Sequence, residues 1–240
     1  RVLVTVQFTI AVFFLISTSV FIKQLSYIHN KDLGIDGNNV IVIPTGLWYG
    51  NREFKEELLR NPKVLSVSAS TSAPIEGGFK RGMVLSHQGS NDTLQVNHFF
   101  VDEDFANTYK LKIVRGQFLQ MSSNAYWEEL DKSQKSKKEG TEYAISIPVV
   151  INETAEKMMG FDNPIGQRIG NDVIVGVVKD FNFQSLHYAI APIVLSNNPE
   201  AINTMNVRIA PGNTSETLTY IREVYKKHRD DREFSYRFFE

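Results

Sequence analysis

The sequence of 240 residues contains no cysteine. This absence excludes disulfide bonds, thiolate metal sites and cysteine nucleophiles together. Lysine and arginine number 26 against 27 for aspartate and glutamate, so the formal net charge is -1. A chain with this balance lacks the basic field with which proteins bind nucleic acid, and we expect no nucleic-acid partner.

The motifs of catalysis and cofactor binding are also missing. The spacing nearest to a phosphate-binding loop, Gly160 to Gly166, has five intervening residues and continues with Gln167 and Arg168 instead of Lys and Ser or Thr. No G-x-S-x-G sequence occurs, and the five histidines form no i, i+4 pair: His29, His87, His98, His187 and His228. We therefore expect no catalytic residue, no cofactor site, no metal site and no enzymatic activity in this chain.

Acidic residues occur in two places where they could form a catalytic or metal site. The cluster Asp102, Glu103 and Asp104 has the residue types of a calcium site or a general-acid pair, but carboxylates are also favoured in the first turn of a helix. We favour the first-turn interpretation. Asp180 follows a strongly apolar strand, but no second titratable group accompanies it as a general base requires, so we expect a turn or packing role.

The longest apolar run lies at the start of the chain. Residues 2–22 read VLVTVQFTIAVFFLISTSVFI, without a charge between Arg1 and Lys23. As a helix this run spans about 31 Å, close to the roughly 30 Å of a bilayer's hydrocarbon core. A signal sequence has a shorter apolar core, and a buried core helix is the weaker alternative. Because the first helix breaker is Gly34, we predict a transmembrane and stalk helix over residues 1–33.

A strand-helix-strand unit occurs at each end of the remaining chain. In the first unit Asn51 caps the helix and Pro62 ends it, and in the second Asn213 is the cap. Two such units can pair into one four-stranded sheet with both helices on one face, the split β-α-β arrangement. We therefore predict an α+β protein with one lobe built from residues 34–76 and 201–240, and an inserted lobe of residues 77–200.

The inserted segment has the pattern of a mixed α/β lobe. Apolar runs predict strands, and two short helices are expected, over residues 102–109 and 152–159. Residues 122–143 carry charges of both signs with few apolar residues, which predicts a mobile surface loop. Aromatic residues in two places are candidates for contact with a partner or between the lobes, with packing on their own lobe as the alternative: Tyr126, Trp127, Phe181 and Phe183.

Several segments resemble the permeases of the MacB/FtsX family of ABC transporters, in the form frequent among Bacteroidetes. They are VQFTIAVFFLISTSVFIKQLSYIHNKDLGID followed by NNVIVI, then FFVDEDFANTYKLKIVRGQ, VVINETAEKMMGFDNPIGQRIG and VIVGVVKDFNFQSLH. These segments cover most of the chain in the order found in the family. The resemblance implies a porter-like lobe from the chain ends and an inserted, sabre-like lobe. Because full permeases have further membrane helices, we expect this chain to be part of a longer polypeptide.

The resemblance also implies a function. A permease subunit of this kind sits in the bacterial inner membrane, with residues 34–240 in the periplasm, and transmits ATP-driven conformational change to an envelope partner. The implied partners are a separate ABC ATPase subunit, a second permease copy or half, and a periplasmic adaptor, lipoprotein or hydrolase regulator. Efflux, lipoprotein trafficking and cell-wall regulation remain equally open. A membrane-anchored sensor domain is the main alternative, and an anchored enzyme is the third class.

Overall fold

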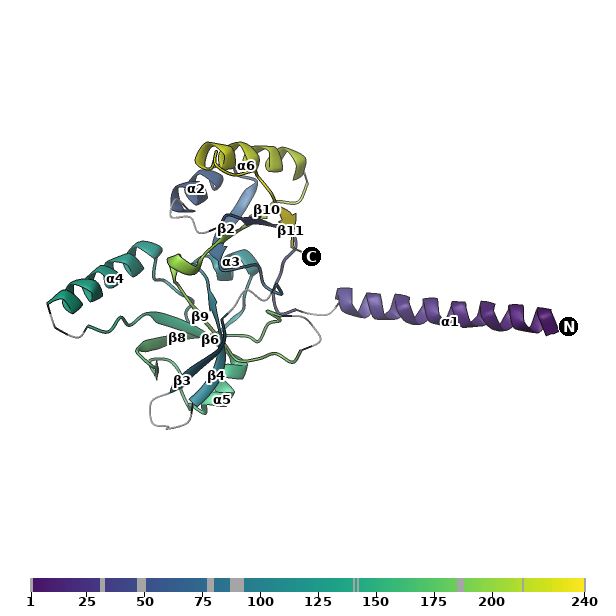
Figure 1. Ribbon diagram of the computed structural model, residues 1–240, viewed down its shortest axis with the longest axis horizontal. Coiled ribbons are helices and arrows are strands. Elements are labelled where there is room, and N and C mark those ends of the chain that lie inside the picture. The colour runs from purple at the N-terminus through teal and green to yellow at the C-terminus, as the bar shows by residue number, and fades with distance from the viewer. Residues whose placement is uncertain are drawn as a thin grey trace. The chain divides into compact units, whose positions relative to one another are not determined.

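The computed structural model describes residues 2–30, 33–46, 51–76, 80–86, 93–139, 141, 143–184, 188–212 and 214–239. The chain divides into two compact units, Arg1–Leu33 and Gly34–Glu240. The first unit contains helix α1, and the second contains all the strands that the structure describes (Figure 1). Each unit is described by itself below.

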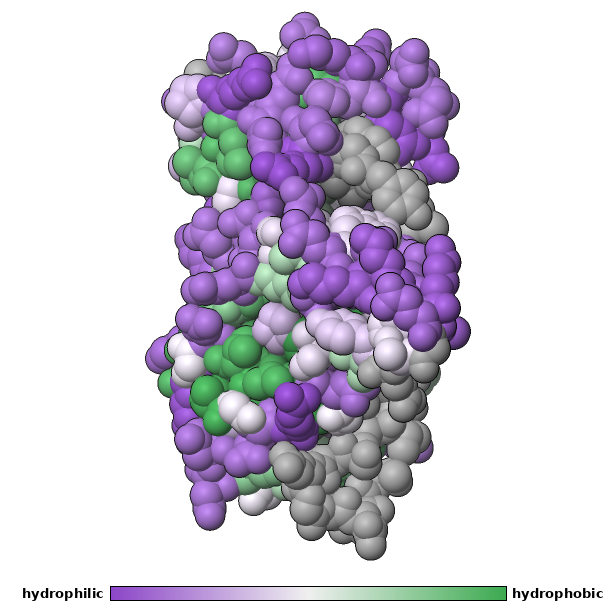
Figure 2. All heavy atoms as spheres, turned by 90° about the vertical axis from the view of Figure 1, so that its left-hand side faces the viewer, coloured by the Kyte–Doolittle hydropathy of each residue, from purple (hydrophilic) through white to green (hydrophobic). Residues whose placement is uncertain are grey.

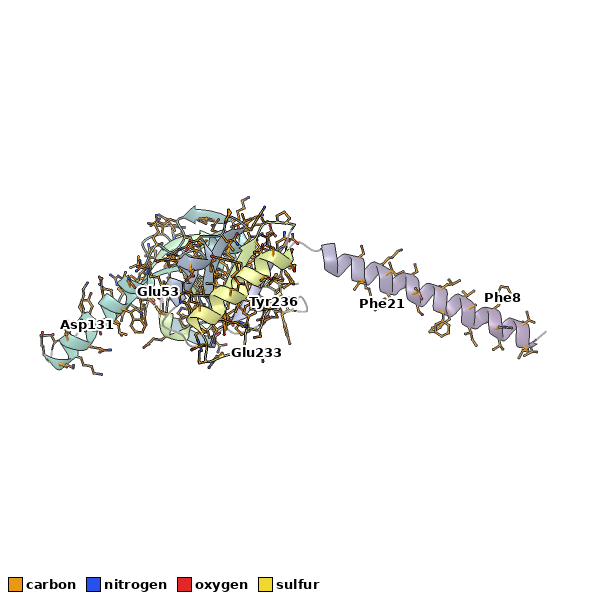
Figure 3. All side chains as sticks on the ribbon, turned by 90° about the horizontal axis from the view of Figure 1, so that it is seen from above. Phe8, Phe21, Glu53, Asp131, Glu233 and Tyr236 are labelled. Carbon is orange, nitrogen blue, oxygen red and sulfur yellow. The ribbon has the colours of Figure 1, made fainter. Side chains whose placement is uncertain are left out.

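Helix α1 runs over Val2–Asn30, without a glycine or proline to interrupt it. Its 29 residues make a rod of about 43 Å. Figure 3 shows its side chains, among them Phe8 and Phe21, projecting on all sides, and residues 2–26 are exposed. The stretch Val2–Ser26 is long and apolar enough to cross a membrane. The predicted helix is therefore present to Asn30, and its predicted end near residue 32 lies outside the described residues.

A four-stranded sheet unites the two ends of the second unit. Its strands lie in the order β11-β1-β10-β2, and each pair of neighbours is antiparallel: β1 Val40–Pro44, β2 Val64–Ser70, β10 Thr204–Ile209 and β11 Arg237–Phe238. This is the predicted split β-α-β order. The last strand is short, because only Arg237 and Phe238 pair with β1.

Two helices cover one face of this sheet, α2 over Asn51–Leu58 and α6 over Thr214–His228 (Figure 1). Every second strand residue points toward them, so the apolar side chains of the strands and helices form one buried core: Ile41, Ile43, Val67, Met205, Val207, Phe54, Leu58, Ile221 and Tyr225. We call the four-stranded sheet with α2 and α6 the end lobe. The exact lobe boundaries at residues 76 and 200 stay predictions.

The intervening segment forms a mixed seven-stranded sheet in the order β3-β4-β9-β6-β8-β5, with β7 beside β8. Its strands are β3 Lys80–Ser86, β4 Thr93–Phe100, β5 Ile113–Gly116, β6 Pro148–Asn152, β7 Arg168–Ile169, β8 Asp172–Val178 and β9 Ile193–Ser196. Helices α3 Phe105–Tyr109, α4 Ser123–Lys138 and α5 Glu153–Met159, with the 3-10 turn Pro199–Ala201, complete what we call the inserted lobe. Helix α5 was predicted over residues 152–159, and it begins one residue later because Asn152 is its cap; Gly160 ends it in a left-handed conformation.

The predicted loop at residues 122–143 is wrong, because most of it is helix α4 (Figure 1). Ser122 caps the helix by accepting a hydrogen bond from the backbone N–H of Ala125. Tyr126 is buried on the inserted lobe, and ion pairs between residues three and four positions apart stabilise the exposed face. The charges of both signs in residues 122–143 therefore belong to the solvated face of a helix and not to a loop. Figure 2 shows the side of the molecule that carries α4, where hydrophilic residues predominate.

Candidate functional site

The two lobes meet at the face of the four-stranded sheet that α2 and α6 leave open. Helix α3 of the inserted lobe packs against β2 and β10 on this face. The strand residues beneath it are polar and buried: Ser66, Ser68, Ser70, Thr204, Asn206 and Arg208. A sheet face with these residues would be expected to lie in water, but here it is buried. We call these six residues, with the helix α3 that covers them, the polar seam.

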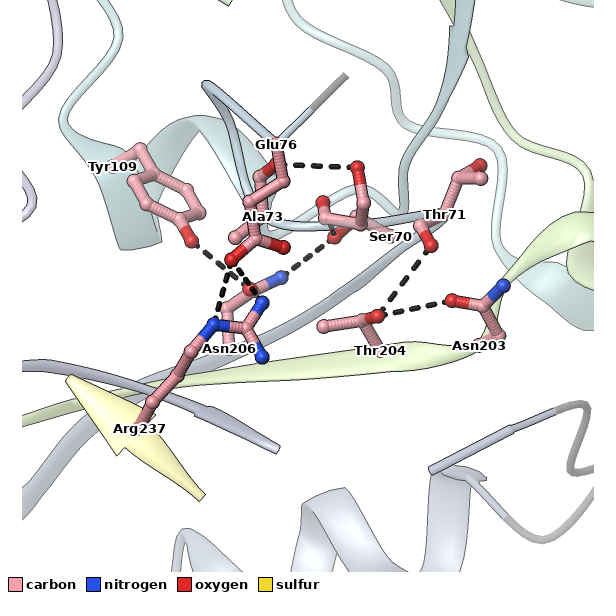
Figure 4. A network of polar contacts seen from close by, with 10 residues as sticks. Ser70, Thr71, Ala73, Glu76, Tyr109, Asn203, Thr204, Asn206 and Arg237 are labelled. Carbon is pink, nitrogen blue, oxygen red and sulfur yellow. Dashed lines mark hydrogen bonds and ion pairs between the residues drawn. The ribbon is translucent and has the colours of Figure 1, made fainter. Parts of the chain in front are cut away.

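A chain of hydrogen bonds crosses this seam (Figure 4). The Tyr109 hydroxyl of α3 donates to Oδ1 of Asn206 on β10 at 2.9 Å, and Nδ2 of Asn206 donates to Oγ of Ser70 on β2 at 2.8 Å. Burial raises the pKa of Tyr109, so its hydroxyl keeps the proton that it donates. Beside this chain the Arg237 guanidinium pairs with Glu76.

Arg208 fixes the chain segment that follows helix α1 in sequence. It is 6% exposed, and its Nε donates to the Thr108 carbonyl of α3 at 2.7 Å. Its two terminal nitrogens donate to the carbonyls of Asn38, at 2.9 Å, and Asp36. The Asp36 N–H in turn donates to the Tyr109 carbonyl at 2.8 Å. One guanidinium thus joins β10, α3 and residues 36–38. We call Arg208 with its partners Asp36, Asn38 and Thr108 the clamp.

Charge and close packing strengthen this clamp. The Asp36 carboxylate accepts from Lys110 at 2.6 Å and lies 3.6 Å from Arg208. Burial acts to raise the pKa of Asp36, but the bonds from Lys110 and the Asn38 N–H, with the Arg208 charge, outweigh it and lower that pKa. Gly34, at φ +74°, approaches the backbone of Asp180 so closely that a Cβ would lie 2.5 Å from its carbonyl oxygen. Residues 34–38 are therefore held against both lobes.

The four aromatic candidates lie in two separate places. Phe181 and Phe183 are fully buried in the cluster that also contains Val40 of the end lobe, so they pack at the junction. Tyr126 packs into the inserted lobe, and Trp127 is half-buried beside it at the edge of a cavity. The structure therefore leaves Trp127 as the candidate with a surface that a partner can reach.

That cavity, of about 380 Å³, opens between α2 and the start of α4. On one side Lys55 of α2 bridges the lobes, at 2.7 Å from the Asp102 carboxylate and 2.5 Å from that of Asp104. The first-turn interpretation of these acidic residues is wrong, because α3 begins only at Phe105 and two of the carboxylates serve this ion pair. Among the described residues, no group of His, Asp and Glu is arranged to hold a metal ion.

Asp180 takes a structural position, in line with the expected turn role. Its carboxylate accepts from the Asn152 side chain at 2.8 Å, and from the Thr154 N–H at 2.9 Å and hydroxyl at 2.8 Å. The Asp180 N–H donates to Glu153 at 3.0 Å. These bonds fix the end of β8 to the start of α5, where a carboxylate also meets the positive end of the helix.

Loss of the Lys55 cation is expected to be costly and dependent on pH. Burial raises the pKa of Asp102 to about 6, above its ordinary 3.8, although the Lys55 charge opposes the shift. In Lys55→Met that opposition is gone, so the pKa rises further. We expect a loss of about 3–5 kcal/mol in unfolding free energy at pH 8. The loss should shrink toward pH 5, because Asp102 is then protonated in both folded proteins.

Urea unfolding at the two pH values measures both effects. Lys132→Met is the matched control, because it breaks a solvent-screened surface pair with Glu129 at 2.7 Å and should leave the stability nearly unchanged at either pH. An equal loss for Lys55→Met at pH 5 and pH 8 would contradict the proposed protonation of Asp102.

Comparison with known proteins identifies the fold. No family model matches the sequence, and no curated protein matches it. The periplasmic region of MacB from Actinobacillus actinomycetemcomitans matches 85% of this chain and 90% of that one, with a TM-score of 0.54 and 19% identity. The second unit has the fold of a MacB-like periplasmic domain. A domain of a protein assigned as a permease from Porphyromonas gingivalis also matches, with a TM-score of 0.51, 15% identity, and 85% and 92% of the chains covered.

The MacB-like fold confirms the predicted α+β class with an N-terminal apolar helix. The chain therefore combines a candidate membrane span with the fold of a periplasmic transporter domain.

Proposed function

We propose that this chain is the first transmembrane helix and the periplasmic region of an ABC transporter permease subunit, placed in the bacterial inner membrane. Its role is to transmit ATP-driven movement to an envelope partner, in efflux, lipoprotein trafficking or cell-wall regulation. The observation that carries the proposal is the anchoring of residues 36–38 by Arg208 and Tyr109. The MacB-like fold and the apolar helix α1 support it.

Transmission needs a firm connection between the moving helix and the lobes. A helix of 29 residues without glycine or proline resists bending. The chain that follows it is bonded to β10 through Arg208 and to α3 through the Asp36 N–H. A displacement of residues 36–38 would therefore act on both lobes at once.

The energy source is expected on a separate subunit. The chain has no phosphate-binding loop, so the purified protein should neither bind nor hydrolyse ATP. Calorimetry with the complete chain in nanodiscs should show no binding, and ATP hydrolysis should appear only when the permease is assembled with an ABC ATPase subunit. Micromolar ATP binding by this chain alone would overturn this division of labour.

The topology follows from the same proposal. Residues 1–240 contain no cysteine, so a single introduced thiol is the one that can react within them. In intact cells with a permeabilised outer membrane, Lys137→Cys on the exposed end of α4 should react with an impermeant maleimide. Ala155→Cys, at a fully buried position, is the unreactive control. Labelling of Lys137→Cys only after cell lysis would place the domain on the other side of the membrane.

A further inference from the structure

Three hydroxyl groups in the polar seam are buried without a hydrogen-bond partner among the described residues. Ser66 and Ser68 on β2 are 5% and 0% exposed, and Thr108 on α3 is 0% exposed. A buried hydroxyl that makes no hydrogen bond loses its hydration without compensation, which destabilises the folded state. Three such groups at one interface require a reason.

The three groups face the same seam from its two sides. Ser66 lies opposite Arg208 and Ser68 opposite Asn206 in the pairing of β2 with β10. Arg208 binds the Thr108 carbonyl, and Asn206 accepts from the Tyr109 hydroxyl of the same helix. Thr108 and the two serines therefore belong to the two sides of one contact between the lobes, that of α3 with β2 and β10.

The serines form a row along β2. Ser66, Ser68 and Ser70 alternate with the apolar Val67 and Ala69, so their side chains recur on one face about every 6.8 Å. Only Ser70 is bonded across the sheet here, through Asn206. We call these three residues the serine row. It offers equivalent hydroxyl groups at successive positions, of which one is in use.

Resting on the proposed function, we propose that α3 has a second position on the serine row, in which the Thr108 hydroxyl pairs with Ser66 or Ser68, and that transmission moves α3 between the two positions. Helix α3 is suited to such a step because it has only five residues and is joined to β10 by hydrogen bonds at Thr108 and Tyr109. Its Phe105 and Ala106 pack in the buried apolar cluster that contains Phe181 and Phe183, so the step moves α3 together with this part of the inserted lobe. A packed apolar interface would lock one arrangement, whereas hydrogen bonds can be exchanged between two discrete ones. Ser66, Ser68 and Thr108 are then positioning residues of the second state.

Two measurements separate this role from a structural one: the thermal midpoint, which should rise in the variant, and the envelope output, which should fall. In the triple variant Ser66→Ala, Ser68→Ala and Thr108→Val, the groups that stand unpaired in the described state are gone. Its thermal midpoint should therefore rise, by about 2–6 °C. In the complete permease assembled with its ATPase, envelope output, read as resistance to a transported compound, should fall at least tenfold while ATP hydrolysis persists. Hydrogen exchange in α3, which should change during ATP turnover in the natural protein, should become insensitive to nucleotide.

Two single variants serve as controls. Ser70→Ala removes a bonded member of the row and should lower the midpoint, and Thr108→Ser keeps the hydroxyl and should keep the output. A lower midpoint for the triple variant would mean that these hydroxyls are satisfied in the described state, which overturns the proposal. Normal output would also overturn it while leaving the proposed function intact. Failure of the natural permease to couple ATP hydrolysis to any output would instead defeat the proposed function.

Discussion

Replacing Arg208 by methionine is expected to lower the unfolding free energy of the second unit by about 4 kcal/mol. Methionine fills much of the space of the aliphatic stem but donates nothing, so the carbonyls of Asp36, Asn38 and Thr108 lose their donors. Unsatisfied buried acceptors cost about 1–3 kcal/mol each, and some of this is recovered where water reaches the site. In a unit of this size the midpoint of thermal unfolding should fall by roughly 10 °C.

Arg52→Met is the matched control for this measurement. Arg52 also pairs with a carboxylate, that of Glu56 at 2.9 Å, but both side chains are more than half exposed. Exposed pairs of this kind contribute little, so the control should have nearly the same stability as the natural protein. If urea unfolding gives the two variants the same stability, Arg208 does not hold the junction as the hydrogen bonds indicate.

Much of the architecture was predictable because it depends on local patterns. The uncharged run at residues 2–22 and the repeated strand-helix-strand units have periodicities that indicate helix and strand directly. The split β-α-β order followed from connection rules that admit few alternatives. Helix α4 was missed because its apolar side chains are few, and its stability depends on the cap at Ser122 and on the packing of Tyr126.

The clamp was not predictable in the same way. Asn206 and Arg208 alternate with apolar residues along β10, and this pattern is typical of a strand with one face in water. What covers that face is α3, about 100 residues away in sequence. Only the contact between the two lobes reveals that these polar side chains are buried and hydrogen-bonded. A contact between residues far apart in sequence produces no periodic pattern in a single sequence. The strongest available signal was an arginine, which is seldom buried without partners.

Ser26→Pro is expected to abolish coupling while leaving the second unit folded. Within α1, proline at this position removes the hydrogen bond to the Ile22 carbonyl and clashes with it, at a local cost of about 3 kcal/mol or more and with a kink. Residues 34–240 form a compact unit of their own, so their fold should survive. With its ATPase subunit, the complete permease should retain ATP hydrolysis and lose envelope output, read as resistance to a transported compound.

A control variant and a direct measurement of the kink show whether the lost output is due to the bend in α1. Ser26→Ala keeps the helix straight and should keep the output, because alanine has the highest helix propensity. Membrane abundance and assembly with the ATPase must match the natural protein, and spin-label distances along α1 should report the bend. If output is normal in a variant with a verified kink, the helix only tethers the domain. The firm attachment of residues 36–38 through Arg208 would then serve stability and not transmission.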